Sequence, residues 1–459
     1  MSQPTLHRTI AALASAISLS AAAAGPLTPP AGPITSTGMT TDQIEPRTPI
    51  SEATTITEPG SYYLTGNLVV TGNAIDIAVP GVTLDLNGFS IIGDGQGPDA
   101  GITVSAVGGQ LPVVIRNGFV RRFDDDGIRA NADGADVTIE RVTVDNCFRG
   151  FDMVSESVLI DCRAVNCTDI GIRTFGRSIL ERCIAENGGN LGFRGEHGIF
   201  INCIARANAG GGFVLGTSGT ATTDAANRFE GCTSAENGGV GFQSDDPAQL
   251  SGCIARNNAG NGFTLADNAR MTDCVSDSND AIGIQVGNGV IITGSSSSSN
   301  GQRGVQGGNA VMLRDVLVTG SGGFGINLGL NARVTDSTSS ENGNDGVLVG
   351  EGSTVTDSLA ALNAGDGFQV GARSKIIACH AEDNDSAGIR GAADVTIDSN
   401  FVTLNATGIV GVSGTLVMRN TAAANSNNFS VSGASVGQIF QLAPNAAFNI
   451  TNSFANVQF

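Results

Sequence analysis

Several residue types are scarce in this sequence of 459 residues. It contains no Trp and two Tyr, and Lys375 is the one lysine among its 24 basic residues. The formal net charge is −19, so the clustered positive charge that binds nucleic acid phosphates or an anionic membrane surface is not expected. The shortage of Trp and Tyr removes the side chains on which neutral sugars usually stack. Nucleic acid is therefore excluded as a partner, and any sugar ligand is expected to be acidic.

Long apolar runs are also missing beyond the N-terminus. No later stretch approaches the roughly 20 apolar residues that a membrane span requires. Residues 10–24 contain only Ala, Ile, Leu and Ser, after a short basic start. This pattern predicts a secretory signal peptide over residues 1–24, with cleavage near Gly25. We therefore expect a secreted, cell-surface or periplasmic protein with no integral membrane segment after signal removal.

Glycine is abundant, with 64 residues, and one glycine position recurs at a regular period. The segments CIARNNAGNGFTLA, from Cys253, and CVSDSNDAIGIQVG, from Cys274, align without gaps at a spacing of 21 residues. One glycine, always followed by an apolar residue, recurs at Gly127, Gly150, Gly171, Gly192, Gly212, Gly241, Gly262, Gly283, Gly304, Gly325, Gly346, Gly367, Gly388 and Gly408. Such self-similarity is the signature of a repeat architecture.

Apolar residues within one repeat alternate, as Phe263 and Leu265 do, and this period of two indicates strands. Three short strands and their turns fit into 21 residues, whereas helical repeats need longer units. We therefore predict an all-β protein, a single-stranded right-handed parallel β-helix solenoid of about 16 coils of roughly 21 residues. Stacked at roughly 4.8 Å, these coils would make a rod roughly 75 Å long.

Equivalent positions of successive coils form columns. Phenylalanines such as Phe242 and Phe263 are expected to stack inside, and an asparagine column that includes Asn208 is expected to satisfy turn groups between coils. Six of the nine cysteines share a third column: Cys162, Cys183, Cys203, Cys232, Cys253 and Cys274. Column neighbours stand about 4.8 Å apart, beyond the roughly 3.5 to 4.5 Å between Cβ atoms of a disulfide. We therefore expect buried free thiols.

The repeat also divides the chain. Residues 25–50 carry six prolines and are predicted to be a linker. Residues 51–430 are predicted to form the β-helix, and the non-repeating residues 431–459 a cap that closes its core. An insertion, Thr217 to Asn227, interrupts the period and is a place where a binding loop could form.

The repeat, as seen in CIARNNAGNGF and its equivalents, resembles the pectin-lyase-like superfamily over nearly all of the mature chain. This superfamily includes polygalacturonases, pectate lyases and other polysaccharide lyases, together with non-enzymatic surface proteins. The resemblance implies a right-handed β-helix and, for an enzyme, a substrate groove along an outward face. It leaves the activity open, because one fold hosts many functions.

Charged residues gather on one outward face of the first regular coils. Two residues after the recurrent glycine, where side chains are expected to face solvent, stand Arg129, Asp152, Arg173 and Arg194. Just before the glycines stand Asp125, Asp126, Arg149 and Asp169. Guanidinium groups bind carboxylates bidentately, so this patch fits an acidic polysaccharide or cell-surface glycan. Arg129, Arg149, Asp152 and Arg194 are the predicted substrate-binding residues.

Two reactions are compatible with this patch. Hydrolysis of a glycosidic bond needs two carboxyl groups, and Asp126 and Asp169 are the candidate pair. For β-elimination, the resemblance to pectate lyases implies an arginine base, here Arg173, and a Ca²⁺ ion held by Asp125, Asp126 or Asp152. No repeated Gly-Gly-x-Gly-x-Asp motif is present, so no metal site is predicted, and the cofactor stays unknown, with Ca²⁺ as the candidate.

A structural explanation stands beside the functional one. Opposite charges on adjacent strands pair simply to keep a flat sheet soluble. Two hypotheses therefore remain. In the first, the β-helix binds an acidic polysaccharide and could also cleave it, as a lyase or as a hydrolase. In the second, it is a non-catalytic structural or adhesive rod on the cell surface. The segment Glu196-His197-Gly198-Ile199 is similar to a polygalacturonase motif, but it is out of register with Gly192. We interpret His197 as a surface histidine.

Overall fold

The computed structural model describes residues 47–106, 111–130, 136–153, 156–216, 227–441 and 452–459. Within these ranges the chain forms 54 strands, from β1 (Thr48–Ile50) to β54 (Asn456–Gln458), and no helix, hence none able to span a membrane. The predicted signal peptide and most of the predicted linker lie outside the described residues. The strand β1 occupies the last three residues of that linker range.

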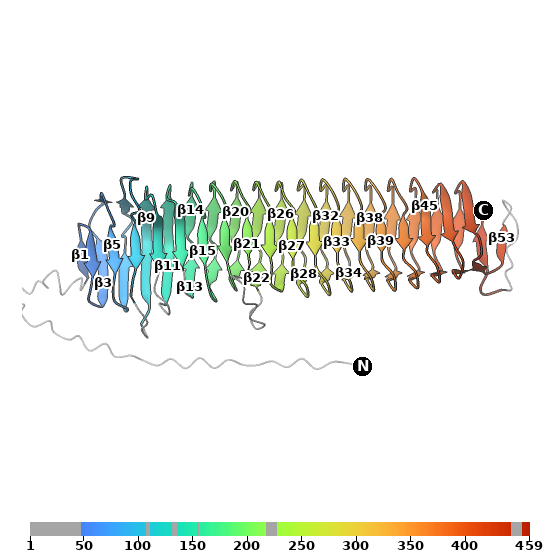
Figure 1. Cartoon of the computed structure of the whole chain (residues 1–459), viewed down its shortest axis with the longest axis horizontal. Coiled ribbons are helices and arrows are strands. Elements are labelled where there is room, and N and C mark those ends of the chain that lie inside the picture. Colours follow the sequence, from blue (N-terminus) through green and yellow to red (C-terminus); the bar gives the residue numbers. More distant parts are fainter. Residues whose placement is uncertain (1–46, 107–110, 131–135, 154–155, 217–226, 442–451) are drawn as a thin grey trace, which may run out of the picture. The chain divides into compact units, whose positions relative to one another are not determined.

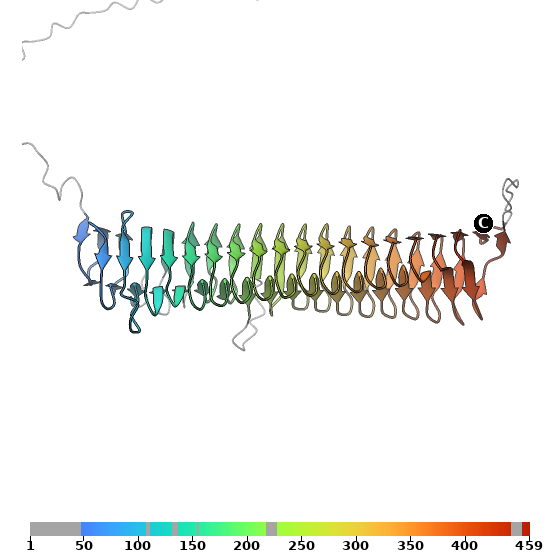
Figure 2. The same cartoon turned by 90° about the horizontal axis from the view of Figure 1, so that it is seen from above.

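The chain from residue 47 winds into coils of three strands each (Figures 1 and 2). One coil contains β19 (Ile199–Ile201), β20 (Ile204–Arg206) and β21 (Phe213–Leu215). Each strand pairs in parallel with its equivalent in the next coil, namely β22 (Asn227–Glu230), β23 (Thr233–Ala235) and β24 (Phe242–Ser244). Three parallel ladders result, which we number in this order, and they confirm the predicted parallel β-helix.

The third ladder contains 18 strands in the described residues, against the 16 or so coils expected. In order these are β2 (Thr54–Ile56), β5 (Ile75–Ile77), β8 (Ile102–Val104), β10 (Asp126–Ala130), β12 (Arg149–Met153), β15 (Ile172–Thr174), β18 (Phe193–Gly195), β21, β24, β27 (Phe263–Leu265), β30 (Ile284–Val286), β33 (Val305–Gly307), β36 (Ile326–Leu328), β39 (Val347–Val349), β42 (Phe368–Val370), β45 (Ala387–Gly391), β48 (Thr407–Gly411) and β51 (Asn427–Val431). The predicted number of coils was too low because loops lengthen the first coils and obscure the 21-residue period there.

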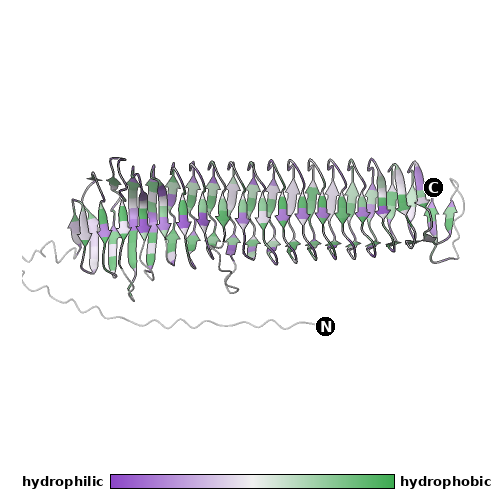
Figure 3. Cartoon of the chain, viewed as in Figure 1, coloured by the Kyte–Doolittle hydropathy of each residue, from purple (hydrophilic) through white to green (hydrophobic). Residues whose placement is uncertain are grey.

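The core is built from stacked side chains, as the sequence predicts. The ring centroids of Phe213 and Phe242 lie 4.8 Å apart with an interplanar angle of 1°, and Phe263 continues the stack at 5.0 Å from Phe242. Rings of the first ladder, such as Phe229, meet this stack edge-on at 5.6 Å from Phe242. Figure 3 shows apolar and hydrophilic residues alternating along the strands, which directs one set inward and the other to solvent.

The asparagine column forms the expected ladder between coils. Asn208 donates through Nδ2 to Oδ1 of Asn237 at 2.9 Å, Asn237 donates to Asn258 at 3.0 Å, and Asn258 donates to Asn279 at 2.9 Å. The same oxygens also accept the backbone N–H of the preceding column member. Each buried amide therefore satisfies backbone groups that would otherwise be unpaired in the turn.

All nine cysteines are buried and free, which confirms the expectation of free thiols. The thiol of Cys183, for example, donates to the carbonyl oxygen of Leu159 at 3.3 Å. Burial raises the pKa of Cys147 and of Cys167 to about 12, so these thiols stay protonated. The cysteine column thus acts as a small, weakly polar filler of the core.

At the C-terminal end of the solenoid the described part of the tail continues the parallel pairing. The strand β54 pairs with β50 (Thr421–Ala423) of the second ladder and with β53 (Ile439–Gln441). Phe454 and Phe459 in this tail are 56% and 57% exposed, so they lie outside the core. Part of the predicted cap, residues 442–451, and residues 217–226 of the predicted binding loop lie outside the described residues.

Candidate functional site

The predicted charged face lies on four consecutive strands of the third ladder, β10, β12, β15 and β18. Their register places Arg129 beside Asp152, Asp152 beside Arg173, and Arg173 beside Arg194. In the first of these pairs of strands, Asp126 also stands opposite Arg149. Because the outward column follows the glycine period, the sequence alone could align these residues. How their side chains contact one another is set by the structure.

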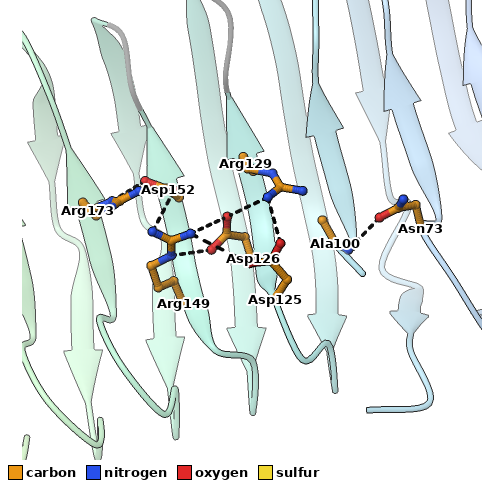
Figure 4. A network of polar contacts seen from close by, with 8 residues as sticks. All are labelled: Asn73, Ala100, Asp125, Asp126, Arg129, Arg149, Asp152 and Arg173. Atoms are coloured by element: carbon orange, nitrogen blue, oxygen red, sulfur yellow. Dashed lines mark hydrogen bonds and ion pairs between the residues drawn. The ribbon is translucent and has the colours of Figure 1, made fainter. Parts of the chain in front are cut away.

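Asp126 is the most buried charged residue of this face. Its side chain is 0% exposed, and it accepts two hydrogen bonds from Arg149, at 2.6 Å from Nε and 3.2 Å from Nη2 (Figure 4). Arg129 Nη1 lies 3.6 Å from the same carboxylate. Two guanidinium groups therefore cover this carboxylate and separate it from solvent.

Asp152 is covered in the same manner. It accepts bonds of 2.5 Å from both Nε and Nη2 of Arg173, and Arg149 Nη1 lies 3.3 Å from its Oδ2. Its side chain is 2% exposed. The expectation that Asp152 faces solvent was wrong, because the long arginine side chains of its own and the next coil fold over its short side chain.

The ion pairs join into one network. Arg129 Nη1 donates to Asp125 at 2.8 Å, and through Arg149 and Asp126 the contacts continue to Asp152 and Arg173 (Figure 4). Three carboxylates thus alternate with three guanidinium groups along the solenoid. Formal charges within the network balance, and each carboxylate is held by at least one arginine.

Burial makes the carboxyl group of Asp126 a weaker acid than an ordinary aspartate. Desolvation, with the nearby charges of Asp152 and Asp125, raises the pKa of Asp126 to about 6, although hydrogen bonds from Arg149 act in the opposite direction. Burial lowers the pKa of Arg149, but the surrounding carboxylates outweigh it and raise that pKa above its ordinary value. The pKa of Asp126 therefore lies well above the ordinary value of an aspartate.

Two predicted site residues lie outside the network. Asp169 is half-buried, and its carboxylate accepts a hydrogen bond from Asn190 Nδ2 at 2.9 Å. The backbone N–H of Asp169 donates to the carbonyl oxygen of Phe148 in the preceding coil, and the N–H of Phe148 donates to that of Asp125 in the coil before it. Asp169 therefore lies two intercoil steps, about 10 Å, from Asp125. Arg194 is exposed and forms no ion pair with any described residue. The structure therefore does not bring Asp126 and Asp169 together at one point.

A hollow of about 270 Å³ adjoins the network on the turns before these strands. Its lining includes Arg122, Asp124, Phe148 and Thr168 from successive coils. Phe148 is 41% exposed, and the guanidinium carbon of Arg149 lies 5.6 Å from the centre of its ring. Arg122 and Phe148 were not among the predicted site residues, although each lies within five residues of the recurrent glycine in its coil.

The three carboxylates suggested for Ca²⁺ already have cationic partners. Asp125, Asp126 and Asp152 all contact arginine nitrogens within 4 Å. Among the described residues, no group of three or more His, Cys, Asp or Glu side chains has a geometry suited to a metal ion. Holding a calcium ion here would require the arginines to move away.

The histidine interpreted as a surface residue is largely covered. The His197 side chain is 13% exposed, and its Nε2 lies 3.7 Å from Oδ2 of Asp246, two coils along. The surface interpretation was therefore wrong for His197. A sequence pattern could not reveal this contact, since Asp246 belongs to a turn and not to an aligned strand position.

Comparison with known proteins supports the architecture. Residues 100–243 match the family model described as the right handed beta helix region. No curated protein matches the chain.

The solved structures that match this chain do so at low sequence identity and low TM-score. The A-module of the mannuronan C-5 epimerase AlgE4 from Azotobacter vinelandii is 16% identical, with a TM-score of 0.26, over 82% of this chain and 91% of its own. Tailspike protein 3 of bacteriophage CBA120 is 12% identical, with a TM-score of 0.29, over 86% and 60%. Pectate lyase Pel9A is 14% identical, with a TM-score of 0.24, over 76% and 72%. Similarity at this level assigns no activity to this chain.

Proposed function

We propose that this right-handed parallel β-helix, which has the architecture of the pectin-lyase-like superfamily, binds an acidic polysaccharide on the face formed by β10, β12, β15 and β18. The observation that carries the proposal is the junction of the ion-pair network with the hollow at Arg149 and Phe148. There a cationic group, an exposed aromatic ring and hydroxyl-bearing Thr168 meet. This combination suits a sugar that carries a carboxylate or sulfate.

Two arginines at the margins of this face have no carboxylate within ion-pair distance among the described residues, although Asp94 and Asp124 line the same hollow as Arg122. Arg122, in the hollow, and Arg194, on β18, are exposed and form no ion pair with any described residue. The arginines between them are held in fixed positions by Asp126 and Asp152. Arg122 Nη2 donates only to the backbone carbonyl oxygen of Asp94, at 3.4 Å. A polyanionic chain would therefore meet a guanidinium group without an ion-pair partner among the described residues at each margin of a charge-balanced centre, with little ordering required of the protein.

The geometry favours binding without cleavage. A general acid must reach the glycosidic oxygen, but Asp126 lies beneath Arg129 and Arg149 with no exposed surface. Asp169 stands apart and is bonded to Asn190. Arg173 gives two nitrogens to Asp152, so its guanidinium group is engaged instead of free to act as a base.

The test is a binding panel with a polyuronate, a sulfated glycan and a neutral glucan. We expect the residue 25–459 protein to bind the first two and not the third, and the double variant Arg122→Ala/Arg194→Ala to lose about tenfold or more in affinity, because two charge-assisted bonds are removed. Arg270→Ala, an exposed arginine of the first ladder, is the matched control and should bind normally. Unchanged affinity in the double variant, or equal binding of the neutral glucan, would refute the proposal.

The same mixtures test cleavage through the ultraviolet absorbance of unsaturated uronates and through new reducing ends. We expect neither signal. If products appear, the binding-only proposal fails, and loss of the signal in Asp126→Asn or Arg173→Ala would assign the reaction to the network.

A structural or adhesive rod is the second candidate, favoured by the mutual neutralisation of the network. In that case the ion pairs would serve only to hold four coils in register. Charge-specific glycan binding that depends on Arg122 and Arg194 distinguishes the two functions, since a purely structural network has no need of arginines outside it.

A further inference from the structure

Beyond the charged face, the same outward column of the third ladder becomes a row of amides. Thr264, Gln285, Gln306 and Asn327 stand in register on β27, β30, β33 and β36. All four are half-buried, and none carries a charge. We refer to Gln285, Gln306 and Asn327 as the amide row.

Neighbouring side chains fix the direction of these amides. Asn261 accepts the backbone N–H of Ile282 at 3.0 Å, and its own Nδ2 donates to Oε1 of Gln285 at 2.7 Å. Arg303 Nη1 donates to Oε1 of Gln306 at 2.6 Å. With their oxygens engaged, Gln285 and Gln306 keep Nε2 groups that have no acceptor among the described residues. Gln285 and Gln306 therefore present oriented N–H donors on two successive coils.

The two sides of the row differ. On one side stand Arg303 and Phe324, with the guanidinium carbon 5.6 Å from the ring centre. On the other side each strand or its following turn carries a glycine, at Gly287, Gly308 and Gly329. A Cβ at these glycines would lie 2.1, 2.6 and 2.4 Å from the side-chain oxygens of Asp267, Asn288 and Asn309 in the preceding coils, so these short polar side chains pack directly against the glycines. The glycine side of the row is therefore bordered by the exposed polar side chains of these three residues.

We infer that the amide row is an extension of the glycan site, on which one linear acidic polysaccharide chain continues from the charged face along the solenoid. This inference rests on the proposed function. Unpaired N–H donors select acceptor-rich groups, namely carboxylates, hydroxyls and ring oxygens, and Arg303 adds a cation for an occasional acidic group. Nine intercoil steps of about 4.8 Å put Asn327 about 43 Å from Arg129.

A sugar chain fits this row better than an extended polypeptide does. A peptide strand advances about 3.4 Å per residue and would drift out of step with coils spaced about 4.8 Å apart. Its backbone also needs donors and acceptors in alternation, whereas the row offers donors. A hexose unit is comparable in length with one coil step, so successive sugars can meet successive amides in similar geometry.

The experiment measures the affinity of oligouronates of two lengths by calorimetry. Short oligomers of about 15 Å cover only the charged face, and long ones of about 45 Å reach the amide row. We expect the wild type to bind the long oligomers about tenfold tighter than the short ones, because the second contact is intramolecular. The triple variant Gln285→Ala/Gln306→Ala/Asn327→Ala should lose that gain and keep normal affinity for short oligomers.

A control variant, Gln249→Ala/Thr272→Ala/Thr293→Ala, removes outward polar groups from the first ladder on β25 (Ala248–Ser251), β28 (Arg270–Thr272) and β31 (Ile291–Thr293). It should retain the length-dependent gain. Gln306→Glu provides a second test that removes no volume, since a carboxylate at this place should repel long oligouronates and leave short ones unaffected.

The possible outcomes separate this inference from the proposed function. If short oligomers bind but the triple variant keeps the full gain with length, the amide row is not part of the site and the charged face stands. If only long oligomers bind and the triple variant loses them, the row stands and the charged face fails. If oligomers of neither length bind, both are refuted.

Discussion

At the scale of single residues, the contacts of a carboxylate matter more than its position in the repeat. Asp126, Asp345 and Asp366 occupy equivalent places before the recurrent glycine. Asp366 is paired with Arg390, and its pKa lies below the ordinary value: burial raises it, but the hydrogen bonds from Arg390, Ser386 and Ala387 outweigh that effect. Asp126 is instead fully buried beside two further carboxylates, and its pKa is raised to about 6. Equivalent sequence positions therefore carry different acidities.

The carboxyl group of Asp126 should titrate with a midpoint near pH 6, as measured by carbon NMR and assigned with Asp126→Asn. Since its pKa is higher in the folded than in the unfolded chain, its contribution to stability is fully present below about pH 4 and is lost as the pH rises through 6. Relative to Asp126→Asn, the wild type should lose up to about 3 kcal/mol of unfolding free energy over this range.

Arg149→Met is the informative companion variant for this titration. In the wild type, the hydrogen bonds from Arg149 lower the pKa of Asp126, so removing them should move the titration midpoint of Asp126 further upward. A midpoint near 4 in the wild type would contradict the burial of this carboxyl group.

At the scale of elements, each three-residue strand is too short to be stable alone, and neighbouring coils supply its partners. The asparagine ladder makes the turns between the second and third ladders equally dependent on their neighbours. Asn258 accepts from both the backbone N–H and Nδ2 of Asn237, at 3.2 and 3.0 Å. It also donates to Asn279 and to the carbonyl oxygen of Ser234.

Asn258→Ala should reduce the unfolding free energy by about 3 kcal/mol or more, because the buried backbone N–H of Asn237 loses its acceptor and the bonds from Asn258 to Asn279 and Ser234 are removed. Urea denaturation followed by circular dichroism measures this loss. The control is Gln249→Ala on the exposed side of β25, which should change stability by no more than about 0.5 kcal/mol. Equal effects of the two variants would show that the ladder is not essential to the turns.

At the scale of the whole molecule, the repeat gives a continuous surface on which a linear ligand can meet equivalent positions in turn. Each coil contacts mainly its neighbours, so stability is close to a sum of coil and interface contributions. The solenoid places charged and amide-bearing coils on one ladder, at successive heights. A compact domain would not offer such a long and regular row.

We further propose that the chain is exported with loss of residues 1–24, on the basis of the apolar N-terminal segment. The protein secreted by its host should begin near Gly25, and its nine cysteines should all be thiols in spite of an oxidising compartment, because each is buried. Intact-mass spectrometry before and after alkylation in denaturant measures both features. An N-terminus at Met1 would refute export by this route, and a mass two units low would reveal a disulfide.

The sequence is sufficient to align most residues of the charged face, but it does not predict which of their side chains contact one another. The glycine period places Arg129, Asp152, Arg173 and Arg194 on one column, and the structure has them in this register. The burial of Asp152 could not be foreseen, since it depends on how neighbouring arginine side chains fold over it. The hollow at Phe148 was missed because turn residues do not follow the strand alternation from which exposure was inferred.

The sequence by itself determined the winding of this protein, its ladders and its free buried thiols. A repeat of 21 residues with alternating apolar positions buries its apolar side chains when the chain winds into stacked coils of short strands. This arrangement does not depend on the conformations of the surface side chains. Only the tertiary structure decided which charges are covered, which arginines stay exposed and which amides point outward. These properties depend on contacts between long side chains of adjacent coils, whose conformations a one-dimensional pattern does not specify.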